Sequence, residues 1–390
     1  MQSPERITHV SSDSGADRTE LRNLRHEPEI GELLGSLVDA ARFSPLHWPR
    51  SVFGKFGSMK HSRYSEYELV WRLPRYLADV VVPSLPGKPP PWLGPPFSWL
   101  FFHRAGELSP PEGGSPTNET AGEQWFFING ILTNRDVARM NAAYLAELFG
   151  RPIRILWNST DGAGLDLLEC ASEKLGARDA DVDMAFHPLL DAITDPMNKR
   201  VVLIAHSQGT LIAAVVLRLM RAVYERTMAG TPGELSSEDR DAVRRHAARE
   251  GLTVRSERLK PTGPEDLARF EVYCFANCAT EMKYIDSDLG LPRIESFGNE
   301  HDLVARLGML APHPEKRQIE ISGPRFRHNG AWGHLLSAHY LVDIDRAHRQ
   351  HEPRPGASRG AAPYVLIEGT APAGTVPHLF GYLHGAGALS

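Results

Sequence analysis

The chain has 390 residues, of which 42% are hydrophobic and 23% charged, so it can bury a large core and is not polar enough to remain disordered. Its formal net charge of −5 provides no basic field of the kind that binds nucleic acid. No apolar run reaches the roughly 18 residues of a spanning helix, and residues 1–30 lack a signal-peptide core. We therefore expect a cytoplasmic protein, with export by a signal-less route left open.

The number of cysteines also favours a cytoplasmic protein. The chain has three cysteines, Cys170, Cys274 and Cys278, an odd and low count that argues against a disulfide framework. Cys274 and Cys278 stand four residues apart in an apolar segment without a neighbouring histidine pair. We interpret them as small buried hydrophobic residues rather than zinc ligands, and we expect no metal in this protein.

The segment before the predicted core has an unusual composition. We expect residues 1–30 to be flexible and residues 31–123 to form an N-terminal helical and proline-rich arm. Within it, residues 80–102 combine many prolines with large apolar groups, and proline excludes a regular helix or a central strand. This stretch could be an extended arm packed over the surface, or a lid whose aromatic groups meet an apolar substrate or a membrane surface.

From residue 124 the pattern alternates between strands and helices. Alternation of this kind is typical of an α/β fold, a mostly parallel sheet with helices on both faces, here with the N-terminal arm as a cap. We place the core at 124–345, with a helical insertion at about 227–268 whose helix opens at a Ser236 capping box. Residues 346–390 form a tail with an edge strand at 364–367. The expected core strands are 125–128, 153–157, 201–205, 270–275, 293–297 and a weaker 318–321, and the expected helices are 136–149, 181–193, 211–226, 236–249 and 335–342.

The stretch 201–210, Val-Val-Leu-Ile-Ala-His-Ser-Gln-Gly-Thr, carries the strongest chemical signal. A buried apolar strand runs into Ser207, and apolar residues at helical spacing follow. A strand, a tight turn and a helix would hold the serine in a strained backbone position with its hydroxyl at the sheet edge. Small residues, Ala205 and Gly209, flank the serine because strand and helix nearly touch there. Strand alternation directs the neighbouring His206 away from the nucleophile's side.

A serine nucleophile needs a base and an acid that orients it, and ligand chemistry in parallel sheets gathers beyond the carboxyl ends of the strands. The acid candidate is Asp302, which follows the 293–297 strand; Glu300 and Glu295 are alternatives. The base candidate is His334, which follows the 318–321 strand and opens an apolar helix after the flexible Gly333. The alternative base is His339, and His328 is a more distant one.

The same chemistry needs donors for an oxyanion. One would be the backbone N–H of Gln208, the residue after the nucleophile. The loop after the first core strand would supply the other, with Gly130 permitting a close backbone approach and Ile131 providing the N–H. An ordinary Asn-Gly turn is the alternative interpretation of Asn129-Gly130.

With these segments in place, the chain resembles the α/β-hydrolase superfamily, in particular its lipase and esterase branches, over about residues 124–345. The resemblance implies Ser207 as nucleophile, Asp302 as acid, His334 as base, an oxyanion hole at Gln208 and Ile131, and no cofactor. The sequence departs from the family where Ala205 replaces the usual first elbow glycine, and where the oxyanion motif begins with Asn129 rather than His-Gly.

The expected activity is hydrolysis of a carboxylic ester, of lipase or carboxylesterase type, through an acyl-enzyme. The expected partner is an apolar ester or lipid substrate, with transient contact to a membrane surface and no nucleic acid. An acyltransferase or thioesterase would use the same three residues. A non-catalytic, hydrolase-like binding module is the third interpretation, because fold alone does not choose among functions.

Overall fold

The computed structural model describes residues 50, 65–66, 106–108, 121–130, 133, 135–158, 179–231, 233–315, 317–350 and 363–386. Several of the sequence predictions lie outside these residues. They are the flexible 1–30 segment, the proline-rich stretch 80–102 with nearly all of the arm around it, Cys170 and Ile131.

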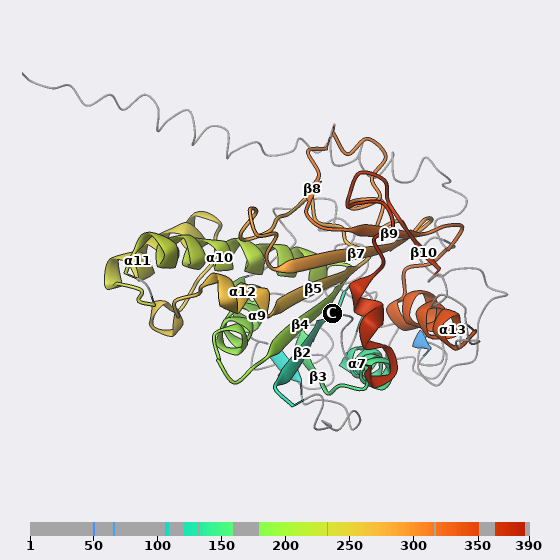
Figure 1. The fold of residues 1–390 in the computed structure, drawn as a ribbon, viewed down its shortest axis with the longest axis horizontal. Helices are drawn as coiled ribbons and strands as arrows, with labels where there is room; N and C mark the ends of the chain where they lie inside the picture. The colour runs from blue at the N-terminus through green and yellow to red at the C-terminus, as the bar shows by residue number, and fades with distance from the viewer. Residues whose placement is uncertain are drawn as a thin grey trace, which may run out of the picture.

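The described residues form one large mixed sheet of eight strands, seen edge-on in Figure 1. Its six inner strands are mutually parallel, and the two edge strands are antiparallel to their neighbours. This confirms the predicted α/β class with a mostly parallel sheet. In order across the sheet, the strands are β1 (Gly106–Leu108), β3 (Ile153–Trp157), β2 (Glu123–Ile128), β4 (Arg200–His206), β5 (Phe270–Phe275), β7 (Arg293–Asn299), β9 (Arg325–His328) and β10 (Tyr364–Leu366).

Strand β4 shows how the apolar run 201–205 serves both faces of the sheet. Val201, Leu203 and Ala205 pack into one buried cluster, and Val202 and Ile204 pack into the cluster on the opposite face. Alternate side chains of a strand point to opposite faces, so a strand covered on both sides is apolar throughout. The central position of β4 follows from this composition.

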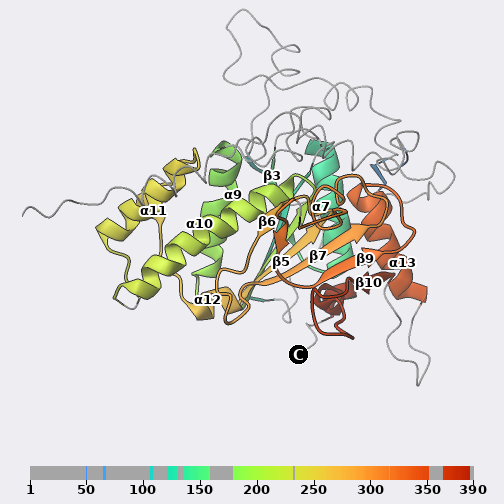
Figure 2. The ribbon, with the colours of Figure 1, turned by 90° about the horizontal axis from the view of Figure 1, so that it is seen from above.

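Helices cover each face (Figures 1 and 2). The first cluster includes side chains of α9 (Asp179–Ile193) and α10 (Gly209–Ala229). The second includes side chains of α7 (Arg135–Phe149), the π-helix η5 (Leu336–Leu341), α13 (Val342–Gln350) and the 3₁₀ segment η6 (His378–Gly385). The prediction of helices on both faces is therefore confirmed, and part of the C-terminal tail joins the core.

The region between α10 and β5 is helical, as predicted for the insertion. It contains α11 (Ser237–Arg249), η4 (Ser256–Arg258) and α12 (Pro264–Ala268). The capping box that opens α11 is present: the Ser236 hydroxyl accepts the Asp239 N–H at 3.1 Å, and the Asp239 carboxylate accepts the Ser236 N–H at 3.3 Å.

Four strands differ from the sequence predictions. The weak strand at 318–321 shrinks to β8 (Glu320–Ile321), which pairs with β6 (Glu281–Met282) in a small separate sheet. The strand that precedes His334 in the main sheet is instead β9, which was not predicted. Strand β1 lies within the segment 31–123, for which no strand was predicted, and it pairs with β3. The edge strand near 364–367 is confirmed as β10.

None of the helices in the described part of the chain combines the length and apolar character needed to cross a bilayer.

Candidate active site

Ser207 occupies the tight turn between β4 and α10. Its φ of +56° lies in the left-handed region, which a residue with a side chain adopts only when its surroundings impose it. The Ser207 N–H donates to the Phe275 carbonyl of β5 at 2.9 Å, and the Ser207 carbonyl accepts the Thr210 N–H at 2.8 Å. The strand, the turn and the helix together fix the serine in this strained position.

Two glycines make room for this turn. A Cβ added at Gly209 would lie 2.7 Å from the Ile128 carbonyl oxygen, so the close approach at this glycine is between α10 and the neighbouring strand β2. A Cβ at Gly130 would lie 2.3 Å from Cβ of Ser207. Only glycine allows the backbone after β2 to approach the serine this closely.

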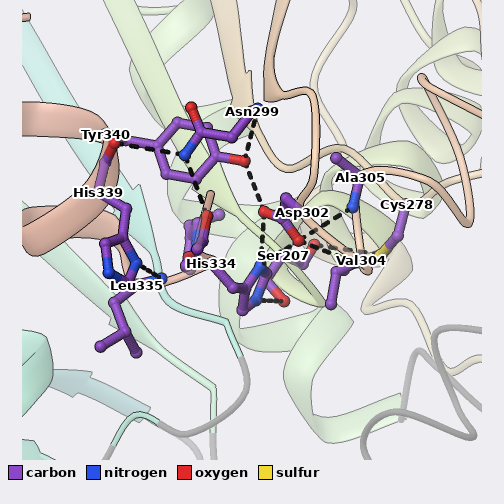
Figure 3. Close-up of polar contacts among 12 residues, drawn as sticks. Ser207, Cys278, Asn299, Asp302, Val304, Ala305, His334, Leu335, His339 and Tyr340 are labelled. Carbon is purple, nitrogen blue, oxygen red and sulfur yellow. Dashed lines mark hydrogen bonds and ion pairs between the residues drawn. The ribbon is translucent and has the colours of Figure 1, made fainter. Parts of the chain in front are cut away.

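The three side chains predicted from separate segments lie together (Figure 3). The Ser207 hydroxyl lies 2.8 Å from His334 Nε2, where it can donate to the ring. On the opposite side of the ring, His334 Nδ1 lies 3.0 and 2.9 Å from the two carboxylate oxygens of Asp302. These contacts form a continuous hydrogen-bonded path from an alcohol through an imidazole to a carboxylate.

The ends of two further parallel strands deliver the acid and the base. Asp302 follows β7, and its Oδ1 accepts the backbone N–H groups of Val304 at 2.8 Å and Ala305 at 3.4 Å. His334 follows β9 after Gly333, whose φ of +100° favours glycine. The loops therefore converge as expected for the carboxyl edge of a parallel sheet.

The alternative acids and bases bind other groups. Glu300 accepts the Gly330 N–H at 2.6 Å, and Glu295 accepts the N–H groups that begin η6. The Nδ1 atom of His339 accepts the Leu335 N–H at 2.9 Å. His328 Nδ1 lies 3.8 Å from a carboxylate oxygen of Asp343. Among these histidines, His334 is the one that accepts the hydrogen bond of the Ser207 hydroxyl.

The hydrogen-bonded path is enclosed. Ser207 and Asp302 have no exposed surface, and His334 is 1% exposed. Enclosure strengthens the interaction between the imidazole and the carboxylate, because water does not screen it.

Polar side chains at the ends of β2, β3 and β4 organise the predicted oxyanion region. The Asn129 amide exchanges two hydrogen bonds with the backbone of Asn158, at 2.8 and 2.9 Å. The Asn158 side chain donates to the Gln208 side chain at 2.8 Å. Gly130 and Gln208 thus lie beside Ser207, whereas the second donor, Ile131, lies outside the described residues. Sequence reasoning missed Asn158, although its position after a strand beside β2 was a usable signal.

The prediction that His206 points away from the nucleophile's side is wrong, because Ser207, with a φ of +56°, has left the strand conformation and strand alternation does not extend to it. His206 contacts the site from the side. Its ring stacks on that of His334 with centroids 4.8 Å apart, and its Nε2–H donates to the His334 carbonyl at 2.8 Å. Burial, and then the charge of His334, hold the pKa of His206 well below its usual range, so its ring stays neutral. It therefore holds His334 in place without competing for the serine proton.

Two more residues of the site were not predicted. Tyr340, in η5, donates its hydroxyl to Asp302 at 2.6 Å. Glu66, from the N-terminal arm, accepts the N–H groups of Ser337 and Ala338 at 2.7 and 2.9 Å, close after His334 in the chain. Burial raises the pKa of Glu66 from 4.5 to about 7. No local sequence pattern marks either residue, because each acts through a long-range contact.

Comparison with known proteins adds no assignment: no protein-family model matches the chain, and no curated protein is significantly similar to it. Within the described residues, no three His, Cys, Asp or Glu side chains gather as a group that could hold a metal ion.

Proposed function

We propose that this protein is a serine hydrolase of the α/β-hydrolase type that cleaves carboxylic esters through an acyl-enzyme. The observation that carries the proposal is the hydrogen-bonded path from Ser207 through His334 to Asp302, which begins at a serine with a φ of +56°. A serine hydroxyl is a weak nucleophile at neutral pH and needs such a base and orienting acid. The parallel sheet and the sequence around Ser207 also resemble those of the α/β-hydrolase superfamily.

In the proposed reaction, His334 Nε2 takes the Ser207 proton as the serine oxygen attacks the ester carbonyl carbon. Asp302 accepts the Nδ1–H of the ring and stabilises the imidazolium that forms. The tetrahedral intermediate collapses as His334 gives the proton to the leaving alkoxide, which departs as an alcohol. Water then attacks the acyl-enzyme with His334 again as base, and this step releases the acid and restores Ser207.

The negative charge on the intermediate needs donors close to Ser207. The Gln208 backbone N–H and a donor from the loop at Gly130 would supply them, with Ile131 as the expected second residue. The close approach of Gly130 to Ser207 supports this role, since a side chain at that position would displace the loop.

The proposed substrate is an ester with an apolar acyl group, such as a lipid, on the basis of the aromatic, proline-rich stretch 80–102. A panel of p-nitrophenyl esters of increasing acyl length tests this class. A site that binds an apolar acyl group gains free energy with each buried methylene, so kcat/KM should rise with acyl length. Activity confined to the acetate ester would contradict the apolar assignment.

Ser207→Ala provides the direct test of the nucleophile. The variant should lose ester hydrolysis by a factor of at least about 10³ while keeping the wild-type circular dichroism spectrum and melting temperature. Hydrolysis that persists in the folded variant would overturn the proposal. Product analysis with added alcohols separates hydrolysis from acyl transfer, and thioester substrates test the remaining alternative.

A further inference from the structure

Tyr340 lies behind the acid of the proposed relay (Figure 3). It is fully buried in η5, and its hydroxyl stands between two groups. The hydroxyl oxygen accepts the Asn299 backbone N–H at 3.1 Å, and the hydroxyl donates to Asp302 Oδ2 at 2.6 Å. The Asn299 N–H occupies a lone pair of the oxygen, so the hydroxyl hydrogen points to the carboxylate.

This donor completes the set of contacts that orient the carboxylate. Val304 N–H holds Oδ1 at 2.8 Å, and Tyr340 holds Oδ2 from another direction. A donor on each oxygen defines the plane of the carboxylate and therefore its angle to His334 Nδ1. Without the hydroxyl, His334 Nδ1 is the one remaining hydrogen-bond partner of Oδ2 among the described residues.

We propose that Tyr340 is a positioning residue of the Ser207 relay, whose hydroxyl fixes the Asp302 carboxylate against His334. The inference rests on the proposed function and extends it by one residue. The π-helix contributes to this placement. The Val342 N–H donates to the Ser337 carbonyl, five residues back, and the resulting wide turn contains Tyr340. Short π-helical turns are frequent at functional sites.

The Tyr340 hydroxyl remains a hydrogen-bond donor over the pH range of the proposed reaction. Burial and the charge of Asp302 raise the pKa of Tyr340 well above its usual range, so the hydroxyl keeps its proton. It thus acts through Asp302 and takes no proton from the substrate.

The test compares wild type with Tyr340→Phe, which removes the hydroxyl and keeps the edge-to-face contacts of the ring with Phe275 and His206. The matched control is Tyr364→Phe, because the Tyr364 hydroxyl is buried and has no hydrogen-bond partner in the described structure. The readouts are the second-order rate of Ser207 labelling by a small fluorophosphonate as a function of pH, and the downfield proton resonance of His334 Nδ1–H.

Tyr340→Phe should react on the order of 10-fold more slowly at its plateau, as expected for loss of a hydrogen bond to a charged group. The midpoint of its pH profile should move to higher pH, because the hydroxyl dipole no longer offsets the negative potential of Asp302 at the imidazolium. The Nδ1–H resonance should shift, and Tyr364→Phe should match wild type in both readouts.

Two results would overturn the role of Tyr340. One is a rate and a midpoint equal to those of wild type. The other is a slower reaction with an unchanged midpoint and resonance, which would mark a structural effect only. Failure of the proposed function is distinguishable from both, since wild type itself would then not be labelled at Ser207.

Discussion

The positions around Ser207 are limited by the space available for side chains as well as by chemistry. A Cβ at Gly130 would lie 2.3 Å from Cβ of Ser207 and 2.6 Å from the His206 carbonyl oxygen, both well inside contact distance. The loop after β2 can stay beside the serine only while position 130 lacks a side chain. Position 130 therefore reports directly on whether this loop serves the reaction.

Gly130→Ala should lower kcat/KM for p-nitrophenyl esters by about 10²-fold, the scale of losing one oxyanion donor, because the loop has to move away from Ser207. Thermal melting shows whether the fold survives. Gly230→Ala, at the far end of α10, is a control for the general effect of adding a methyl group, since its φ of −96° suits alanine and an added Cβ would lie 3.3 Å from its nearest neighbour, the Arg226 carbonyl oxygen. An active Gly130→Ala variant would exclude the loop from the site.

The Asp302 carboxylate accepts from His334 Nδ1 and so sets the tautomer that leaves Nε2 free for the serine proton. In Asp302→Asn, the amide can donate to Nδ1 and favour the wrong tautomer. We expect kcat to fall on the order of 10³- to 10⁴-fold with little change in KM. A fall of less than about 10-fold in a folded variant, measured by steady-state kinetics, would show that Asp302 is not the orienting acid.

At the scale of elements, the site depends on the ends of three neighbouring strands. Asn129 follows β2, Asn158 follows β3 and Gln208 follows β4, and hydrogen bonds join the three in sequence. Asn158 is 1% exposed, so its amide has no access to water as a substitute partner. This polar chain fixes the backbone of the predicted oxyanion loop relative to the serine.

Asn158→Ala should therefore destabilise the protein by about 1–3 kcal/mol and also lower kcat about 10-fold. Asn198→Ala is the matched control: Asn198 is also buried and hydrogen-bonded, but it precedes β4 at the opposite end of the sheet. It should show a similar loss of stability in urea unfolding and an unchanged kcat. Equal kcat in both variants would assign Asn158 a purely structural role.

The sequence predicted the elements whose apolar pattern is continuous, such as β4 and α10, and the position of Asp302 after its strand. It did not predict β9, because the run Arg-Phe-Arg-His shows only one buried apolar residue, Phe326. The structure brings His334 to the Ser207 hydroxyl, although the strand assigned before it was wrong. Tyr340 and Glu66 could not be predicted, since their partners lie 38 and about 270 residues away in the chain.

At the scale of the whole molecule, two buried carboxylates tie distant segments to the core. Glu66 connects the N-terminal arm to the start of η5, and Glu295 in β7 accepts the N–H groups of His378 and Leu379 in the tail. Burial raises both pKa values from 4.5 to about 7. The carboxylates are therefore more easily protonated in the folded chain than in the unfolded one.

This difference predicts the pH dependence of stability. The contribution of each group is complete below pH 4.5 and is lost as pH rises to about 7, by about 1.4 kcal/mol per pH unit at most. Urea unfolding between pH 5 and 8 measures the slope. The double variant Glu66→Gln, Glu295→Gln should flatten this part of the profile, and an unchanged slope would show that neither carboxyl titrates in this range.

The central claim is that His334 activates Ser207, and covalent labelling tests it most directly. Native protein treated with a small fluorophosphonate should carry one adduct, located at Ser207 by peptide mass spectrometry. His334→Ala should lose the adduct, whereas His246→Ala, at an exposed histidine of α11 that pairs with Glu250, should keep it. No adduct at Ser207 in the folded native protein, or equal labelling in His334→Ala, would contradict the account.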